Sequence, residues 1–350
     1  MKQKKQPLTY QLLSRYRGVL MGISIINIIL FHYFDDVKTS EVVLVNAQQL
    51  FYRYINSSNV DIFILVSGLG LYFSMKKNRN LAAFYKRRFS RVLIPYFLVA
   101  VPAIYWRQII FYHRGMKSFW QIFAVPLESR WFWYIWMISF CYLIFPYVFD
   151  MFDSVKDRIQ EQMYLAVVFI VILLFTVFLR DNVPEAYEQY EIALLRLPWF
   201  FVGCMLGKAS YEKRKIHSGL LFFIVTTLVL LPLREDSDSI VTRNVLAAFN
   251  LSLCFMLVIV LNGLSETRVL RYPIRLLTVV LEFFGKYSLE LYLTHVAIRR
   301  VFIELGYPMQ EMKYEGLMVL FSIIVSLILK PISSLLEGLI LDPPFSRRVS

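Results

Sequence analysis

Long apolar stretches, separated by short polar segments that are often basic, fill the chain from residue 18 to residue 341. A helix that crosses a bilayer needs about 20 mostly apolar residues, and stretches near that length recur throughout. The ten candidate spans are 18–34, 60–75, 92–110, 131–149, 163–179, 192–207, 216–232, 245–264, 277–298 and 316–341. This pattern predicts an all-α polytopic membrane protein with about ten transmembrane helices in one bundle. The membrane domain would cover 18–341, between a basic N-terminal segment at 1–17 and a tail at 342–350.

The composition excludes the main alternatives to a membrane protein. Hydrophobic residues make up 58% of the 350 positions and charged residues 18%, against about 45–50% and about 25% in soluble proteins. A water-soluble domain could not bury so much apolar surface, and a disordered chain would contain far less. The three cysteines, Cys141, Cys204 and Cys254, lie in apolar stretches without metal-ligand spacing, so no metal site is expected.

The net charge of +13 would suggest nucleic-acid binding in a soluble protein. With ten spans, however, the polar segments on the side of the two termini hold 23 Lys and Arg residues, and those on the other side hold 12. Cytoplasmic loops of membrane proteins carry an excess of Lys and Arg. The charge therefore predicts cytoplasmic termini and a multi-pass protein, and a nucleic-acid partner loses its support.

Two histidines stand out among the ionisable residues of the spans. His32 ends the first span and His295 lies in the outer half of the ninth, so both should lie at a similar depth. Histidine is the usual general base near neutral pH, although an intramembrane histidine can equally be structural. Asp35 and Asp36 follow closely enough to orient His32. The side chains of Arg130, Asp61 and Arg196 also fall toward the outer side.

A basic segment at 76–91, predicted to be a cytoplasmic loop, contains the second candidate site. Arg88 and Arg91 are three residues apart and could present two guanidinium groups to one side, which suits phosphate. Arg87 and Lys86 add charge beside them. The alternative interpretation is a plain cytoplasmic anchor.

The remaining intramembrane charges favour structural roles. Glu282, Lys286 and Glu290 are spaced four apart, so Lys286 could pair with either carboxylate on one helix face. Lys330 and Glu337 are interpreted as packing or snorkelling groups of the last span.

Six segments, in order along the chain, resemble motifs of the membrane-bound acyltransferase 3 family. They are Gly18–His32, ending in Leu-Phe-His; Asp61–Gly68; Arg87–Tyr96; Trp131-Phe132 with Tyr142, Leu143 and Pro146; Phe200–Gly203; and Gly285–His295. Two departures bear on the acceptor geometry. Met21 stands where the family usually has an arginine, with Arg17 one turn earlier. Ser129 and Arg130 replace the usual histidine before Trp-Phe.

The resemblance implies transfer of an acyl group, commonly acetyl, from cytoplasmic acyl-coenzyme A to a hydroxyl of an envelope carbohydrate or lipid-linked glycan. The setting would be a bacterial plasma membrane. His32, His295 and Asp35 would form the catalytic group. Phosphates of acyl-CoA would be held by Arg88, Arg91, Arg87 and Lys86, and the acceptor by Arg130, Trp131, Asp61 and Arg196.

Some relatives carry a fused extracytoplasmic domain that completes the transfer. None is expected in this chain, so the acceptor would enter the bundle directly or be supplied by a separate extracytoplasmic partner. The sequence leaves direct and relayed transfer open.

Two other functions would share some of these features. A transporter or flippase for a glycan, lipid or small solute would also have many helices and midplane charges. A lipid-linked glycosyltransferase would need acidic loop motifs, and the string Asp236-Ser237-Asp238 is better explained as a solvated loop.

Overall fold

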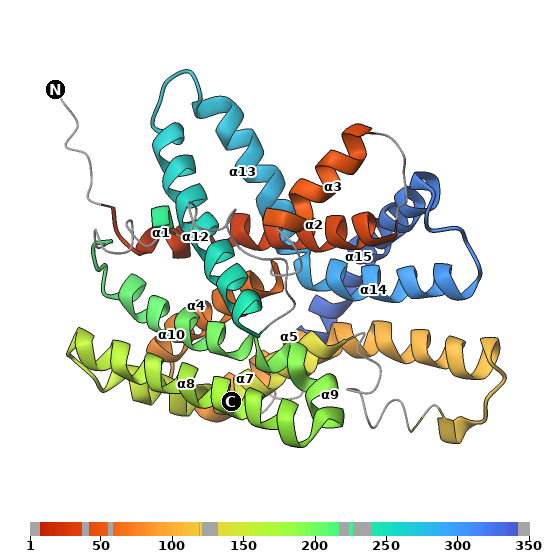
Figure 1. The fold of residues 1–350 in the computed structure, drawn as a ribbon, viewed down its shortest axis with the longest axis horizontal. Helices are drawn as coiled ribbons and strands as arrows, with labels where there is room; N and C mark the ends of the chain where they lie inside the picture. The colour runs from red at the N-terminus through yellow and green to blue at the C-terminus, as the bar shows by residue number, and fades with distance from the viewer. Residues whose placement is uncertain are drawn as a thin grey trace, which may run out of the picture.

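The computed structural model describes residues 8–36, 42–54, 59–118, 120, 132–216, 224–226 and 240–341. Within these ranges the chain is helical, with one isolated backbone bridge between Thr9 and Lys215 (Figure 1). The elements are α1 (Gln11–Arg15), α2 (Arg17–Asp36), α3 (Val42–Tyr54), α4 (Asn59–Lys77), α5 (Leu81–Tyr105), the π-helix η2 (Trp106–Phe111), α7 (Trp133–Asp153), α8 (Arg158–Asn182), α9 (Pro184–Leu194), α10 (Leu197–Tyr211), α12 (Ile240–Ser265), α13 (Arg271–Lys286), α14 (Ser288–Glu304) and α15 (Met312–Leu341).

Seven helical stretches of the described chain are long and apolar enough to cross a membrane. They are Arg17–Asp36, Leu81–Phe111, Trp133–Asp153, Arg158–Asn182, Pro184–Tyr211, Thr242–Ser265 and Met312–Leu341. These confirm an all-α, multi-pass membrane protein. The second predicted span, 60–75, is the helix α4, and the seventh, 216–232, lies mostly outside the described residues. The count of ten therefore stays a prediction.

The ninth predicted span is wrong as a single helix. The apolar stretch 277–298 is divided between α13 and α14, because Tyr287 leaves helical geometry with φ −100° and ψ 6°. The packing just before the break is close. A side chain on Gly285 would overlap the carbonyl oxygen of Gly18, so the end of α13 lies backbone to backbone against α2.

The predicted loop 76–91 is also wrong over most of its length. Helix α4 continues to Lys77 and α5 begins at Leu81, so only three residues connect them. Asn80 caps α5, because its side-chain oxygen accepts a hydrogen bond from the backbone N–H of Ala83 at 2.9 Å. The basic residues 86–91 therefore lie on a regular helix, where Arg88 and Arg91 share a face.

A second close crossing joins α4 to α10. A Cβ on Gly203 would overlap the carbonyl oxygen of Leu65, and a Cβ on Gly68 would come within 2.5 Å of the carbonyl oxygen of Phe200. Small residues at such crossings let helix backbones approach each other in a membrane, where no hydrophobic effect drives helices together. The motif segments Asp61–Gly68 and Phe200–Gly203 therefore meet at this crossing.

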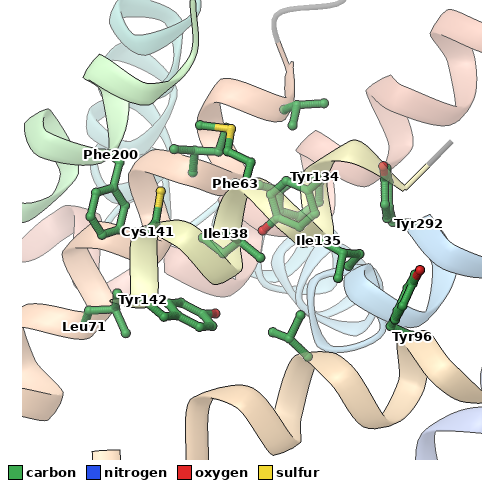
Figure 2. Close-up of a cluster of buried hydrophobic side chains, with 14 of the residues drawn as sticks. Phe63, Leu71, Tyr96, Tyr134, Ile135, Ile138, Cys141, Tyr142, Phe200 and Tyr292 are labelled. Carbon is green, nitrogen blue, oxygen red and sulfur yellow. The ribbon is translucent and has the colours of Figure 1, made fainter. Parts of the chain in front are cut away.

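Aromatic side chains from several helices fill the core around α7. Phe145 and Cys141 are fully buried, and the Phe145 ring stacks on Phe84 of α5 at 5.6 Å between centroids. Figure 2 shows this cluster, with Phe200 from α10 and Tyr96 from α5 on either side of α7. Packing of this kind fixes α7 between the helices that carry the candidate sites.

Polar contacts group the connecting segments at two ends of the bundle, as the sequence predicts. At one end, Lys76 pairs with Asp153 at 2.6 Å and Tyr10 donates its backbone N–H to Arg214. Two hydrogen bonds from Arg214 to Glu161 raise the pKa of that guanidinium above its usual value. At the other end, Asp36 pairs with Arg299, Arg107 with Glu304 and Arg243 with Glu191. Which end faces the cytoplasm stays a prediction.

The expected ion pair of Lys286 is wrong. Glu290 pairs instead with Lys330 of α15, at 2.9 Å, while Lys286 and Glu282 lie exposed. Lys330 therefore joins α15 to α14 and is not a snorkelling group.

Candidate functional site

Three arginines from two helices gather at the end of the bundle that holds α1. Arg17 begins α2, and Arg88 and Arg91 lie on the first half of α5. Each guanidinium is within electrostatic range of the others, and all three are within that range of the hydroxyl of Tyr142, which is buried on α7. Arg88 is half-buried, whereas Arg17 and Arg91 reach the surface. A ligand from the aqueous phase can therefore contact all three.

Gly70 of α4 makes room for the first of these arginines. A Cβ at residue 70 would lie 2.5 Å from a terminal nitrogen of Arg17. The guanidinium consequently rests against the backbone of α4, within electrostatic range of Arg91 on α5. Arg17 therefore supplies a cation to the group that holds Arg88 and Arg91, although Met21 stands at the position where the family usually has arginine.

The three arginines differ from their basic neighbours in having no acidic partner. Lys76 and Arg79 both bind Asp153, at 2.6 and 2.7 Å, and Lys208 binds Glu161 at 2.6 Å. Among the described residues, none of the three forms an ion pair, and neither do the exposed side chains of Lys86 and Arg87. Several cations held close together without carboxylates repel one another, so this group favours binding of an anion with several phosphates.

Buried tyrosines line the interior between this end and the other. Tyr134 lies about two turns from Tyr142 along α7, and its ring meets that of Tyr292 on α14 at 5.4 Å between centroids. Figure 2 shows Tyr134 and Tyr292 on neighbouring helices, with Tyr142 further along α7. Hydroxyl groups thus occur at intervals within an otherwise apolar core.

The two candidate histidines lie together at the opposite end of α2. The rings of His32 and His295 are 5.3 Å apart between centroids and inclined by 32°. His295 is fully buried, and neither of its ring nitrogens has a hydrogen-bond partner in the described part of the chain. The same holds for Nδ1 of His32, whose side chain is only partly buried. The prediction that both rings share one depth is confirmed, and the pair contains buried ring nitrogens without a hydrogen-bond partner among the described residues.

The carboxylate that faces this site is Asp36 rather than Asp35. Arg299 donates two hydrogen bonds to Asp36, both at 2.6 Å, and Asp36 is within electrostatic range of His32. The Asp35 side chain is 58% exposed, and its nearest oxygen is 4.0 Å from Arg299. An orienting role for Asp35 consequently has no geometric support, and Asp36 takes its place.

The proposed acceptor residues fall into two groups. Asp61 and Arg196 lie 3.4 Å apart, and Arg196 also rests on the ring of Trp133 at 5.3 Å. Asp61 faces a small, mostly apolar cavity between α4, α10 and α12. The contact between Asp61 and Arg196 gives both residues a structural role. Their role in acceptor binding stays a prediction. Arg130 and Trp131 lie outside the described residues.

Sequence reasoning missed three residues that the structure places at these sites. Arg299 follows His295 by four residues, so helical spacing could have indicated it. Tyr142 belonged to a motif but was not assigned a role. Glu315 is fully buried at the start of α15, and the sequence pattern alone gave it no role. Its contact with Asp36 joins segments 279 residues apart, which no local pattern reveals.

Comparison with known proteins gives one match. A family model described as an acyltransferase domain matches residues 19–331, which is most of the chain. The chain belongs to the acyltransferase 3 family. No curated protein and no solved structure matches it.

Membership of the acyltransferase 3 family and the apolar helices together make the protein a membrane acyltransferase. The match begins within α2 and ends within α15, so both clusters lie inside the acyltransferase domain apart from Arg17, two residues before its start. Among the described residues, no group of three His, Cys, Asp or Glu side chains could hold a metal ion.

Proposed function

We propose that the protein transfers an acyl group, most simply acetyl, from cytoplasmic acyl-CoA to a hydroxyl of an envelope carbohydrate or lipid-linked glycan. The observation that carries this proposal is the placement of two unlike clusters at the two ends of α2. Arg17 and His32 are fifteen residues apart, which corresponds to about 22 Å of helix. A phosphate-binding group at one end and a basic imidazole at the other match the two ends of an acyl-CoA donor.

The donor would bind with its phosphates on Arg17, Arg88 and Arg91. Its long thioester arm would then enter the bundle toward the tyrosines of α7, where an apolar interior with spaced hydroxyls suits an amide-containing chain. Lys86 and Arg87 add positive charge at the entrance. Acyl-CoA is thus the donor substrate of the proposal, and no resident cofactor is required.

His32 would act as the general base, since its side chain is the more accessible of the two histidines. As the acceptor hydroxyl attacks the thioester carbonyl carbon, Nδ1 or Nε2 of the imidazole takes the hydroxyl proton. The C–S bond then breaks, and the coenzyme A thiolate leaves and takes up that proton. The negative charge of Asp36 would stabilise the imidazolium between these two events. His295, fully buried beside it, would orient the ring or contact the acceptor.

A transporter or flippase would keep a substrate site between helices but would not break a thioester. Purified protein in lipid discs should therefore release free thiol from acetyl-CoA when a carbohydrate acceptor is added. Deletion of the gene should remove ester-linked acyl groups from envelope glycans, measured by mass spectrometry. Unchanged glycans together with no thiol release would exclude the proposed transfer.

The His32→Ala variant tests the base directly. Loss of a general base typically lowers the rate by about 10²–10⁴, so turnover should fall by that factor while the protein remains in the membrane. His113→Asn is a suitable control, because His113 lies exposed in a loop with φ 51°, a conformation that asparagine tolerates. Wild-type turnover of purified His32→Ala would contradict the mechanism.

A further inference from the structure

A group of ionisable side chains lies next to His32, where the C-terminal end of α2 meets α14 and the start of α15. Asp36 accepts two hydrogen bonds from Arg299, so this pair is neutral as a unit. Glu315 of α15 contacts the same carboxyl group and is 0% exposed. Two carboxyl groups therefore share one guanidinium.

The contact between Glu315 and Asp36 requires a proton. Neither oxygen of Glu315 receives a hydrogen bond from a donor in the described part of the chain, and the carboxyl group that it interacts with is that of Asp36. Two ionised carboxylates have only acceptors, so a hydrogen bond between them forms only when one of them is protonated. Ionising both would also leave an uncompensated charge in a buried site, which is costly.

The neighbouring groups do not supply a second cation. Asp35 is largely exposed and negative, and Tyr33 lies within electrostatic range of Glu315 but is uncharged. Of the two histidines, whose rings face each other, His32 is within electrostatic range of Asp36, and the cation within range of Glu315 is Arg299.

We propose that Asp36 and Glu315 share a single proton and that Glu315 is a positioning residue for His32. The second half of this statement rests on the proposed function. With one proton shared, Asp36, Glu315 and Arg299 form a neutral set that holds the outer end of α2 against α14 and α15. Asp36 lies one turn from His32, and the single negative charge of the carboxyl pair stabilises the imidazolium. The pair gains and loses no proton during transfer, because the hydroxyl proton passes through His32 to the thiolate.

Infrared difference spectroscopy on the purified wild-type protein tests the shared proton without any substrate. At neutral pH, the C=O stretch of a protonated carboxylic acid should be present in wild type and lost in Glu315→Gln. The glutamine N–H can still donate to Asp36, so this variant preserves the contact. Glu311→Gln, in the exposed turn before α15, should leave the band unchanged. A spectrum of Glu315→Gln with the band intact would overturn the proposal.

Isotope labelling covers the case in which Glu315→Gln does not fold. In wild-type protein, ¹³C labelling of glutamate or of aspartate carboxyl groups should shift a protonated-acid band. No shifted band with either label would refute the shared proton.

Turnover measurements test the positioning role separately. Glu315→Ala should lower kcat by about ten- to a hundredfold, as expected when a catalytic group is misplaced, with little change in KM for acetyl-CoA. Glu315→Gln should recover part of that loss. Loss of the band in a Glu315→Ala protein that keeps wild-type kcat would refute the positioning role. If wild type itself shows no acyl transfer, the proposed function fails, whereas the spectroscopic result still decides the shared proton.

Discussion

Arginines without acidic partners among the described residues distinguish the end of the bundle that holds α1. Other basic side chains at this end form ion pairs with carboxylates. Lys76 and Arg79, for example, both pair with Asp153. Arg88 and Arg91 instead face Arg17 and the Tyr142 hydroxyl. A plain cytoplasmic anchor would not need to concentrate cations against a buried hydroxyl, so the arrangement favours phosphate binding over anchoring.

Replacing these arginines should weaken donor binding specifically. A hydrogen bond to a charged group contributes about 1.5–3 kcal/mol, and about 1.4 kcal/mol corresponds to a factor of ten. Arg88→Ala or Arg91→Ala should therefore raise KM for acetyl-CoA by about tenfold or more. Lysine at either position should restore only part of the affinity, because it cannot bind phosphate with two parallel hydrogen bonds.

The exposed Lys77, on α4, offers a control for charge alone: Lys77→Ala should leave KM unchanged. An Arg88→Ala, Arg91→Ala double variant with wild-type donor dependence would leave only the anchor interpretation.

Gly70 provides an indirect test of Arg17. A methyl group at residue 70 would meet the far end of the Arg17 side chain, which can move, rather than backbone, which cannot. Gly70→Ala should therefore fold and raise KM for the donor several-fold by displacing one guanidinium. Arg17→Ala should have the same effect, and the two changes together should add little beyond either alone. Full additivity in a double-mutant cycle would show that Gly70 does not act through Arg17.

Single helices were largely predictable, whereas their interruptions were not. Apolar stretches near 18–34, 131–149 and 316–341 predicted α2, α7 and α15 to within a few residues, because burial in lipid demands continuous hydrophobicity. The break at Tyr287 lies inside a continuous apolar stretch, so hydrophobicity does not mark it, although Gly285 and Ser288 flank it. The close contact of Gly285 with Gly18 just before the break is visible only once α2 and α13 are packed together.

The same limit applied to the sites. The sequence predicted the depth of His32 and His295, since span direction alone places both. It could not choose between Asp35 and Asp36, because the choice depends on Arg299 from another helix.

Glycines at the helix crossings should be critical for assembly rather than for chemistry. On Gly203 or Gly285 a methyl group would overlap a backbone carbonyl oxygen of the facing helix. Overpacking typically costs about 1–3 kcal/mol and more where backbone must move. Gly203→Ala and Gly285→Ala should therefore lower the thermal unfolding midpoint in detergent.

Gly338 of α15 is the matched control, because nothing lies within 4 Å of the added methyl group. Gly338→Ala should unfold at or above the wild-type temperature, as alanine favours a helix. Equal midpoints for Gly203→Ala and Gly338→Ala would show that the crossing of α4 and α10 can separate without cost.

At the scale of the whole molecule, the proposed reaction depends on which end of the bundle faces the cytoplasm. Contacts among the described residues place the connecting segments at two ends of the bundle. The count of Lys and Arg residues predicts that the more basic end faces the cytoplasm. Acyl-CoA is a cytoplasmic metabolite and envelope glycans lie outside. The proposed function therefore requires the arginine cluster to face inward and the histidine pair to face outward.

Cysteine labelling in intact cells tests this orientation. Lys77 lies exposed at the arginine end, and Gln310 lies exposed in the segment before α15 at the histidine end. A membrane-impermeant maleimide should label Gln310→Cys from outside but reach Lys77→Cys only after the cells are permeabilised. The native cysteines Cys141, Cys204 and Cys254 are buried and should contribute little background. The reverse labelling pattern would place the arginines outside, beyond the reach of cytoplasmic acyl-CoA, and would rule out the donor site even if the helical packing is correct.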